Sequence, residues 1–294
     1  MRLGILLSII ASTLFAMMPI FLQLLPDINS FAVIGQRILW SCIIITLVLL
    51  AMGDLRSALQ PLTRLSNWPG LVGGALLIGS MWAVFVWGPL NGETLGVAMG
   101  FFLAPMVMIV VGLIIFKDRL SHLQYLAAAV ALAGVILNLW NTGEFSWVAL
   151  VIAIGYPLYL IFRRLQPIPV LAAFYMENLL LAPLAIWACV VFGEVRHPFD
   201  YEIYMLLLFF GISLLGTSGI LFFLAASKRL PLALLGLLGY LEPFLIFLIA
   251  LFILDEKILP GEGMTYGLIC AAMLLLVLDG LLQFLKQGNR KQSD

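Results

Sequence analysis

The strongest constraint in this sequence is a series of apolar stretches, each about as long as a bilayer is thick. A helix that spans the hydrocarbon core needs about 20 mostly apolar residues. Hydrophobic residues make up 64% of the chain and charged residues 10%, against about half and about a quarter in soluble domains. The sequence therefore predicts an all-α integral membrane protein with ten transmembrane helices, at residues 3–25, 31–52, 69–90, 94–116, 122–140, 145–162, 169–192, 203–226, 231–254 and 262–286. The first run is longer than the apolar part of a signal peptide, and we interpret it as the first membrane helix.

Lysine and arginine residues fall mostly on one side of the predicted bundle. Arg37 lies inside a span, and Arg196 and Lys257 fall on one face. The other face receives the remaining twelve: Arg2, Arg56, Arg64, Lys117, Arg119, Arg163, Arg164, Lys228, Arg229, Lys286, Arg290 and Lys291. Because such residues favour the cytoplasmic side, we expect a protein of the bacterial cytoplasmic membrane with both termini in the cytoplasm.

The chain also contains an internal repeat. Residues 104–120 align with residues 242–258, so that Pro105 falls on Pro243 and one charged triplet falls on another. Each copy has five helices, an odd number, so the second copy is inverted in the membrane. Inverted repeats are a common construction in secondary transporters. We therefore expect a first repeat over 1–141 and a second, inverted repeat over 142–294.

Four segments carry a family resemblance, namely residues 36–41 (QRILWS), 77–87 (LIGSMWAVFVW), 95–120 and 225–257. They are distributed along most of the chain. They resemble the EamA type of the drug/metabolite transporter (DMT) superfamily and, within it, the RarD-like transporters. The glutamate–proline pair at 242–243 with an acidic–basic pair further along is typical of EamA halves. The resemblance implies ten helices in two inverted five-helix repeats and transport of small organic molecules.

The sequence departs from the RarD-like pattern at Met81 and Ala104, where members of the family often carry asparagine. Both positions are apolar here. We therefore expect a less polar ligand.

Three ionisable residues lie deep in predicted spans. Glu242 is about 15 Å into a core roughly 30 Å thick, and Arg37 is about 9 Å into its helix. Glu177 lies at a similar depth to Arg37, in the helix that is its repeat equivalent. A charge at such depth is costly and must face the bundle or a wet cavity. We expect Arg37 to pair with one carboxylate, so that the other is left to bind substrate or a proton; a purely structural ion pair is the alternative.

The paired prolines predict interrupted helices. Pro105 and Pro243 cannot donate the helical hydrogen bond, which leaves the carbonyls of Phe101 and Gly239 free. Free carbonyls at membrane depth are tolerated where they line protein or water. We expect helix breaks at Pro105 and at Pro243 with Gly239 that contribute to a binding site; simple kinks that shape the bundle are the alternative.

Aromatic residues share the central layer with these charges. They suit a cavity for drug-like or amino-acid-like solutes, although ordinary membrane packing is the alternative for each. The candidates are Trp40, Trp82, Phe101, Phe102, Tyr175 and Tyr240.

Other polar residues suggest structural roles. Asp279, near the end of the last span, is interpreted as a helix-end contact. The charged triplets at 117–119 and 255–257 are interpreted as solvated loop charges or salt-bridge latches.

Few other chemistries fit the sequence. The chain has no Walker-type phosphate loop, and its two histidines, His122 and His197, fall at opposite faces. We therefore expect no metal site, no cofactor and no catalytic residue, and hence no enzyme. The net charge of zero gives no reason to expect a nucleic-acid partner.

The sequence thus predicts a secondary active transporter that moves small organic molecules by alternating access. Its partners would be the substrate and the lipid bilayer. The sequence leaves open whether transport is coupled to a proton. An uncoupled facilitator or exchanger is the main alternative, and a membrane enzyme or a receptor is a further one. The sequence does not distinguish a monomer from a homodimer.

Overall fold

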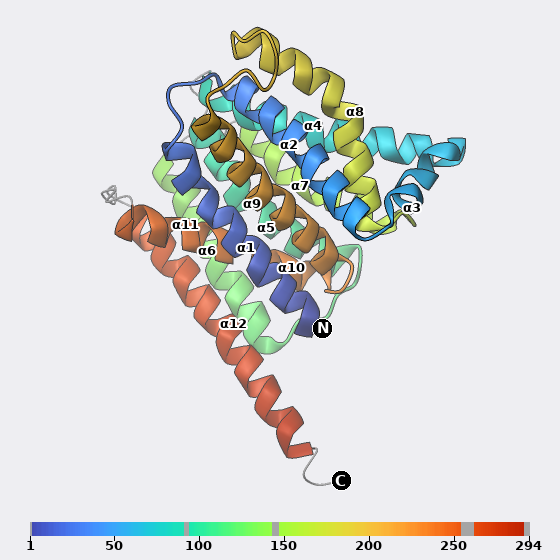
Figure 1. Cartoon of the computed structure of the whole chain (residues 1–294). Coiled ribbons are helices and arrows are strands. Elements are labelled where there is room, and N and C mark those ends of the chain that lie inside the picture. Colours follow the sequence, from blue (N-terminus) through green and yellow to red (C-terminus); the bar gives the residue numbers. More distant parts are fainter. Residues whose placement is uncertain (1, 91–93, 143–146, 254–261, 291–294) are drawn as a thin grey trace.

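The computed structural model describes residues 2–90, 94–142, 147–253 and 262–290. Within these ranges every regular element is a helix (Figure 1). The long elements are α1 (Arg2–Gln23), α2 (Ser30–Ala51), α4 (Trp68–Leu90), α5 (Thr94–Ile114), α6 (His122–Thr142), α7 (Trp147–Leu165), α8 (Val170–Phe192), α9 (Ile203–Ser227), α10 (Leu232–Gly239), α11 (Leu241–Phe252) and α12 (Glu262–Arg290). Three short helices, α3 (Leu55–Leu59), η1 (Gln60–Thr63) and η2 (Leu65–Asn67), connect α2 to α4.

A helix occupies each of the predicted spans, and the span 231–254 is shared by α10 and α11. Six helical stretches are both long and apolar enough to cross a membrane: α1, α2, α7, α8, α9 and residues 263–280 of α12. Large apolar side chains are exposed on many of these helices, for example Leu47, Trp187 and Leu207. Such surfaces suit lipid and not water, as expected for a membrane protein.

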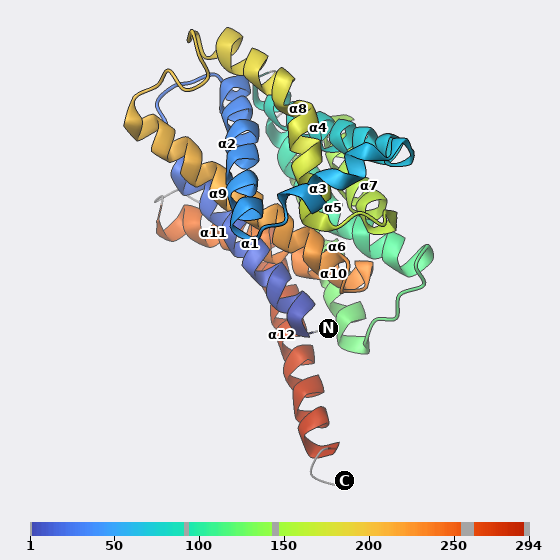
Figure 2. The ribbon, with the colours of Figure 1, turned by 45° about the vertical axis from the view of Figure 1, so that its right-hand side comes forward.

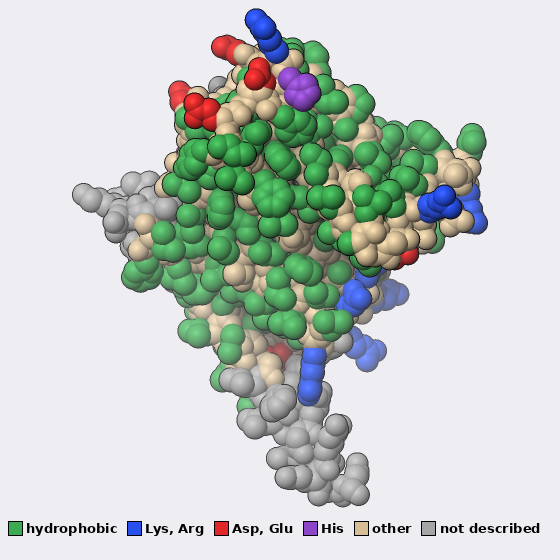
Figure 3. Space-filling view, viewed as in Figure 1, with side chains coloured by type: hydrophobic (Ala, Val, Ile, Leu, Met, Phe, Trp, Pro, Cys, Tyr) green, Lys and Arg blue, Asp and Glu red, His purple; other side chains and the backbone are tan. Residues whose placement is uncertain are grey.

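The surface carries the same pattern. In the face shown in Figure 3, hydrophobic side chains cover the broad middle of the molecule, and charged side chains gather toward its upper and lower parts. In Figures 1 and 2, α1 begins and α12 ends toward the same lower end of the molecule. A belt of apolar side chains between charged ends is the arrangement that a bilayer requires.

The helices pack in pairs that are often distant in sequence. α1 lies along α9, α2 along α8, and α6 along α12. α5 lies between α7 and α10, and α4 contacts both α7 and α8. Apolar residues from α2, α4, α7, α8 and α9 form one continuous core, which includes Ile45, Leu71, Tyr159, Phe174 and Leu224.

The helical stretch 232–252 is broken, whereas the stretch 94–114, which contains Pro105, is not. α10 ends at Gly239, and α11 begins at Leu241 after the single residue Tyr240. Pro243 then lies in the first turn of α11, where a missing N–H costs little. In contrast, α5 continues through Pro105, so the break expected at that proline is absent.

The helices before and after the break contact different neighbouring helices. α10 packs against α5, whereas α11 packs against α1 and α12. The α5–α10 contact is close because two glycines face backbone: Gly236 lies beside the carbonyl of Pro105, and Gly112 lies beside the amide of Ala233. A side chain at either glycine would push the two helices apart.

We expect Gly112→Val to lower the stability of the folded protein by about 3 kcal/mol, because its Cβ would overlap the backbone of α10. Gly267→Val is the matched control, since no atom lies within 4 Å of a Cβ built at Gly267. The measurement is the thermal unfolding midpoint of each variant in detergent. Equal midpoints for the two variants would contradict the close α5–α10 contact.

Candidate functional site

Arg37 projects from the second turn of α2 toward the centre of the bundle. Its guanidinium carbon lies 4.7 Å from the centroid of the Trp82 ring on α4, within the range of a cation–π interaction. On α9, Gly216 leaves room for the guanidinium, whose Nε would lie 2.9 Å from a Cβ at that position. No carboxylate of the described residues lies within 4.0 Å of Arg37. The cation is therefore held by an aromatic face and a glycine recess.

Tyr156 lies near this cation and near a carboxylate. It is on α7, within electrostatic range of both Arg37 and Glu242. Its ring lies 5.4 Å from that of Phe101 on α5. Sequence reasoning missed Tyr156, although it shares one face of α7 with Tyr159 and Arg163, at i, i+3 and i+7. Hydroxyl and guanidinium groups at that spacing in a spanning helix were the available signal.

Glu242 lies in the first turn of α11, directly after the helix break. The amino end of a helix favours a negative charge, which makes this a suitable place for a carboxylate. Glu242 is half-buried, and within the described part of the chain no Lys or Arg nitrogen lies within 4.0 Å of it. The direct Arg37–Glu242 ion pair that the sequence suggested is therefore not formed among the described residues.

Glu177 belongs to a different cluster. Its carboxylate lies 3.5 Å from Arg163 Nη1 and accepts a hydrogen bond of 2.7 Å from the Tyr159 hydroxyl. The side chains of Arg163 and Glu177 are 2% and 0% exposed. Gly74 on α4 leaves the space that the carboxylate occupies. The sequence placed Arg163 just beyond the span 145–162, on the basic face; the structure instead places it within α7, buried as the partner of Glu177.

Polar contacts extend this cluster. Arg163 also donates a hydrogen bond to the side chain of Gln166, and Gln166 Nε2 donates to the carbonyl of Gly70 at 3.1 Å. Lys228, just beyond α9, donates to the carbonyl of Ile168 at 3.2 Å. Burial, and then the charge of Arg163, lower the pKa of Lys228. The cluster therefore ties together α4, α7 and α8.

The predicted aromatic residues separate into two sets. Trp82 contacts Arg37, and Phe101 contacts Tyr156, so both border the central charges. Trp40 is one turn from Arg37, but its ring packs edge-to-face against Phe199 and Phe210.

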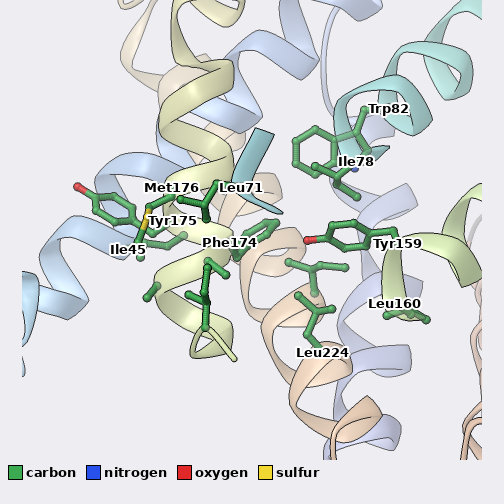
Figure 4. Close-up of a cluster of buried hydrophobic side chains, with 14 of the residues drawn as sticks. Ile45, Leu71, Ile78, Trp82, Tyr159, Leu160, Phe174, Tyr175, Met176 and Leu224 are labelled. Carbon is green, nitrogen blue, oxygen red and sulfur yellow. The ribbon is translucent and has the colours of Figure 1, made fainter. Parts of the chain in front are cut away.

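The other aromatic candidates make their polar contacts with other groups. The Tyr175 hydroxyl is 2.8 Å from Thr46 Oγ1, and Figure 4 shows it directed away from Tyr159 and Trp82. Tyr240 donates a hydrogen bond of 3.2 Å to the carbonyl of Phe102, and both belong to a separate apolar cluster with α6 and α12.

The two positions that depart from the family pattern are buried. Met81 on α4 packs into the recess at Gly155, next to Tyr156 along α7. Ala104 is 5% exposed within α5. Met81 therefore places an apolar thioether beside the central charges.

The structural role predicted for Asp279 is confirmed. Its carboxylate accepts hydrogen bonds of 2.8 Å from Ser121 Oγ and from Gln124 Nε2, which join α12 to the start of α6. Asp118, in the first charged triplet, accepts a hydrogen bond of 3.0 Å from the amide of Ala233 at the start of α10. It thus caps a helix and is not a freely solvated charge. The second triplet, at 255–257, lies outside the described residues.

Comparison with known proteins identifies the family. No protein-family model matches the chain. The chloramphenicol-sensitive protein RarD of Pseudomonas aeruginosa is 36% identical over 291 residues, covering 98% of this chain and 97% of that protein. The chain belongs to the RarD-like transporter family. An uncharacterized transporter of Haemophilus influenzae is 31% identical over 95% of both chains, and protein RarD of Escherichia coli is 28% identical over the same shares.

A solved crystal structure confirms the fold independently. It superposes with a TM-score of 0.70 at 17% identity, over 94% of this chain and 96% of its own. RarD-like relatives are bacterial and several are named transporters, and the apolar helices suit a membrane. The protein is thus a multi-pass transporter of the bacterial inner membrane, and these relatives' names point to a class of protein that is not enzymatic.

Removing Arg163 should be strongly destabilising, because it leaves the Glu177 carboxylate buried without its ion partner. Breaking one side of a buried ion pair costs about 3–5 kcal/mol. We expect Arg163→Ala to lower the thermal midpoint in detergent far more than Arg229→Ala, whose side chain is exposed. A further Glu177→Gln change should restore part of the loss, since it removes the uncompensated charge. Equal midpoints for the two single variants would refute the structural importance of the pair.

Proposed function

We propose that the protein is a secondary active transporter of small organic molecules, built from ten membrane-spanning segments in two inverted repeats, 1–141 and 142–294. Under this proposal α1, α2, α4, α5 and α6 correspond to α7, α8, α9, α10–α11 and α12. The pairing of helices supports it. Three contacts join equivalent elements: α2 with α8, α5 with α10, and α6 with α12. The remaining large contacts occur as matched pairs: α1–α9 with α7–α4, α2–α9 with α8–α4, and α5–α7 with α11–α1.

The deep charges obey the same correspondence. Arg37 on α2 lies against Gly216 of α9, and Glu177 on α8 lies against Gly74 of α4. Each charge therefore occupies a glycine recess in the equivalent neighbouring helix. The basic residues support a cytoplasmic location of both termini, and the placement of the ends of α1 and α12 on one side agrees with it.

The substrate site that we propose consists of Arg37, Trp82, Phe101, Tyr156 and Glu242. The observation that carries the proposal is a cation and a carboxylate deep in the bundle, each without a partner of opposite charge within 4.0 Å among the described residues. Tyr156 lies within electrostatic range of both. An ionised side chain at such depth costs free energy, so its presence there favours a functional role. Arg37 would bind an acidic or hydrogen-bond-accepting group, and the aromatic rings would cover an apolar body. Drug-like and amino-acid-like molecules meet this description.

Glu242 would carry the coupling ion. A carboxylate can bind a proton or the cationic group of a substrate, but not both together. That competition is what links proton movement to substrate movement, and alternating access then exposes the site to each side in turn. An uncoupled exchanger, in which Glu242 binds substrate alone, is the second candidate.

The coupling proposal is tested with Glu242→Gln, which keeps the shape of the side chain and removes the titrating group. A solute is first chosen by thermal-shift screening of the purified protein, starting with chloramphenicol because a relative is named for sensitivity to it. In proteoliposomes we expect the variant to lose substrate-driven proton flux and to retain solute counterflow. Asp279→Asn is the control for loss of a buried carboxylate. Proton flux at the wild-type level in Glu242→Gln would remove Glu242 from coupling.

The binding role of Arg37 is tested with Arg37→Lys. Lysine keeps the charge but loses the planar group that stacks on Trp82. We expect KM for an acidic solute to rise about three- to tenfold, in line with a cation–π contribution of about 1 kcal/mol, with kcat little changed. The measurement is concentration-dependent counterflow. An unchanged KM for every transported solute would place the substrate elsewhere.

A further inference from the structure

The two ends of the bundle are packed differently. On one side of the break, residues 232–237 of α10 are all buried, and α10 lies in close contact with α5 at Gly112 and Gly236. On the other side, α11 packs along α1 and α12, and its described side chains from Leu241 to Ile246 are half-buried. α5 is thus in close contact with α10, whereas α11 packs mainly along α1 and α12. Glu242 lies at the start of α11.

The buried Arg163–Glu177 pair lies at the closed end. Lys228, near the start of α10, lies close enough to Arg163 for that charge to lower the pKa of Lys228. The pair links α7 to α8, Gln166 links the end of α7 to Gly70 on α4, and Tyr159 adds a hydrogen bond from α7 to α8. Tyr159 also belongs to an apolar core cluster with Leu160 and Phe174 (Figure 4). These contacts join α4, α7 and α8 at this end of the bundle.

Under the proposed repeat, Arg37 is equivalent to Glu177 and lies toward the other end of the bundle. Arg37 occupies its glycine recess without a carboxylate within 4.0 Å among the described residues, whereas Glu177 is paired. In an inverted repeat the two ends exchange roles during the cycle, so equivalent positions are closed in turn. One paired and one unpaired charge is the pattern expected when one end is closed and the other is not.

We infer that Arg163, Glu177 and Tyr159 form the gate at this end of the bundle, closed in the present structure, and that the ion pair must separate once in each transport cycle. A buried ion pair suits this role because its attraction is largely offset by the loss of hydration. When the end opens, water solvates both charges again, so the open state carries no large penalty. The inference rests on the proposed alternating-access function and assigns residues to one of its steps.

The test uses Phe101→Cys, beside Tyr156, to report from which side of the membrane the central site is accessible. Labelling by a membrane-impermeant thiol reagent is measured in right-side-out and inside-out vesicles, and labelling of the chain without the reporter is subtracted because Cys42, Cys189 and Cys270 are present as free thiols. Glu177→Gln abolishes the ion pair and keeps the side-chain volume. We expect about tenfold faster labelling from the cytoplasmic face, where the basic residues place this end, and slower labelling from the opposite face.

Two further variants make the result decisive. Tyr159→Phe removes only the hydroxyl and should shift labelling in the same direction by a smaller factor, which keeps the test available if Glu177→Gln is poorly folded. Asp279→Asn, which removes a buried carboxylate between α6 and α12, should leave the sidedness unchanged. Wild-type sidedness in both gate variants would overturn the gate but not transport. Labelling from one face only in every variant, even after long exposure, would overturn alternating access itself.

Discussion

The cost of placing charge in hydrocarbon governs how this protein is organised. A bilayer offers no water to solvate an ionised side chain, so each deep charge must find its stabilisation inside the bundle. The chain does this in two ways. Glu177 is paired with Arg163 and hydrogen-bonded by Tyr159, which gives a buried cluster. Arg37 and Glu242 are not paired with each other, and both are half-buried.

Glycine makes both arrangements possible. A guanidinium or carboxylate pointing into a helix bundle needs a gap in the facing helix, and Gly216 and Gly74 provide one each. Glycine lowers helix propensity by about 1 kcal/mol relative to alanine, so its presence in the middle of a spanning helix calls for a packing reason. Here the reason is a neighbouring charged side chain. At Gly112 and Gly236 the absence of a side chain allows the backbones of α5 and α10 to lie in contact.

The sequence predicted the helices well because length and apolar content decide membrane spans almost without reference to tertiary structure. It could not predict which charges would meet, because that depends on which helices become neighbours. Arg163 illustrates the difficulty: next to Arg164 and close to a helix end, it had the appearance of a loop charge.

Helix periodicity separates those adjacent arginines. Arg163 shares a face with Tyr156 and Tyr159 and enters the core, whereas Arg164 turns about 100° away and lies over the ring of Phe116. A search for polar residues at i, i+3 and i+7 within a span would have selected the first and not the second. Such a search identifies the polar face of α7, but it does not identify α8 as its partner.

Pro105 and Pro243 show how strongly tertiary neighbours decide the effect of a local sequence signal. Both remove one helical hydrogen bond, yet α5 continues through Pro105 while the chain breaks before Pro243. α5 keeps α7 and α10 as neighbours, and Gly236 and Gly239 pack against Pro105 itself. In the broken helix, α10 contacts α5, whereas α11, which contains Pro243, contacts α1 and α12. The chain changes direction between α10 and α11 to make both sets of contacts. Proline therefore permits a break, and the surrounding helices determine whether it forms. Because only Pro243 has a carboxylate beside it, the break and the charge occur together at Glu242.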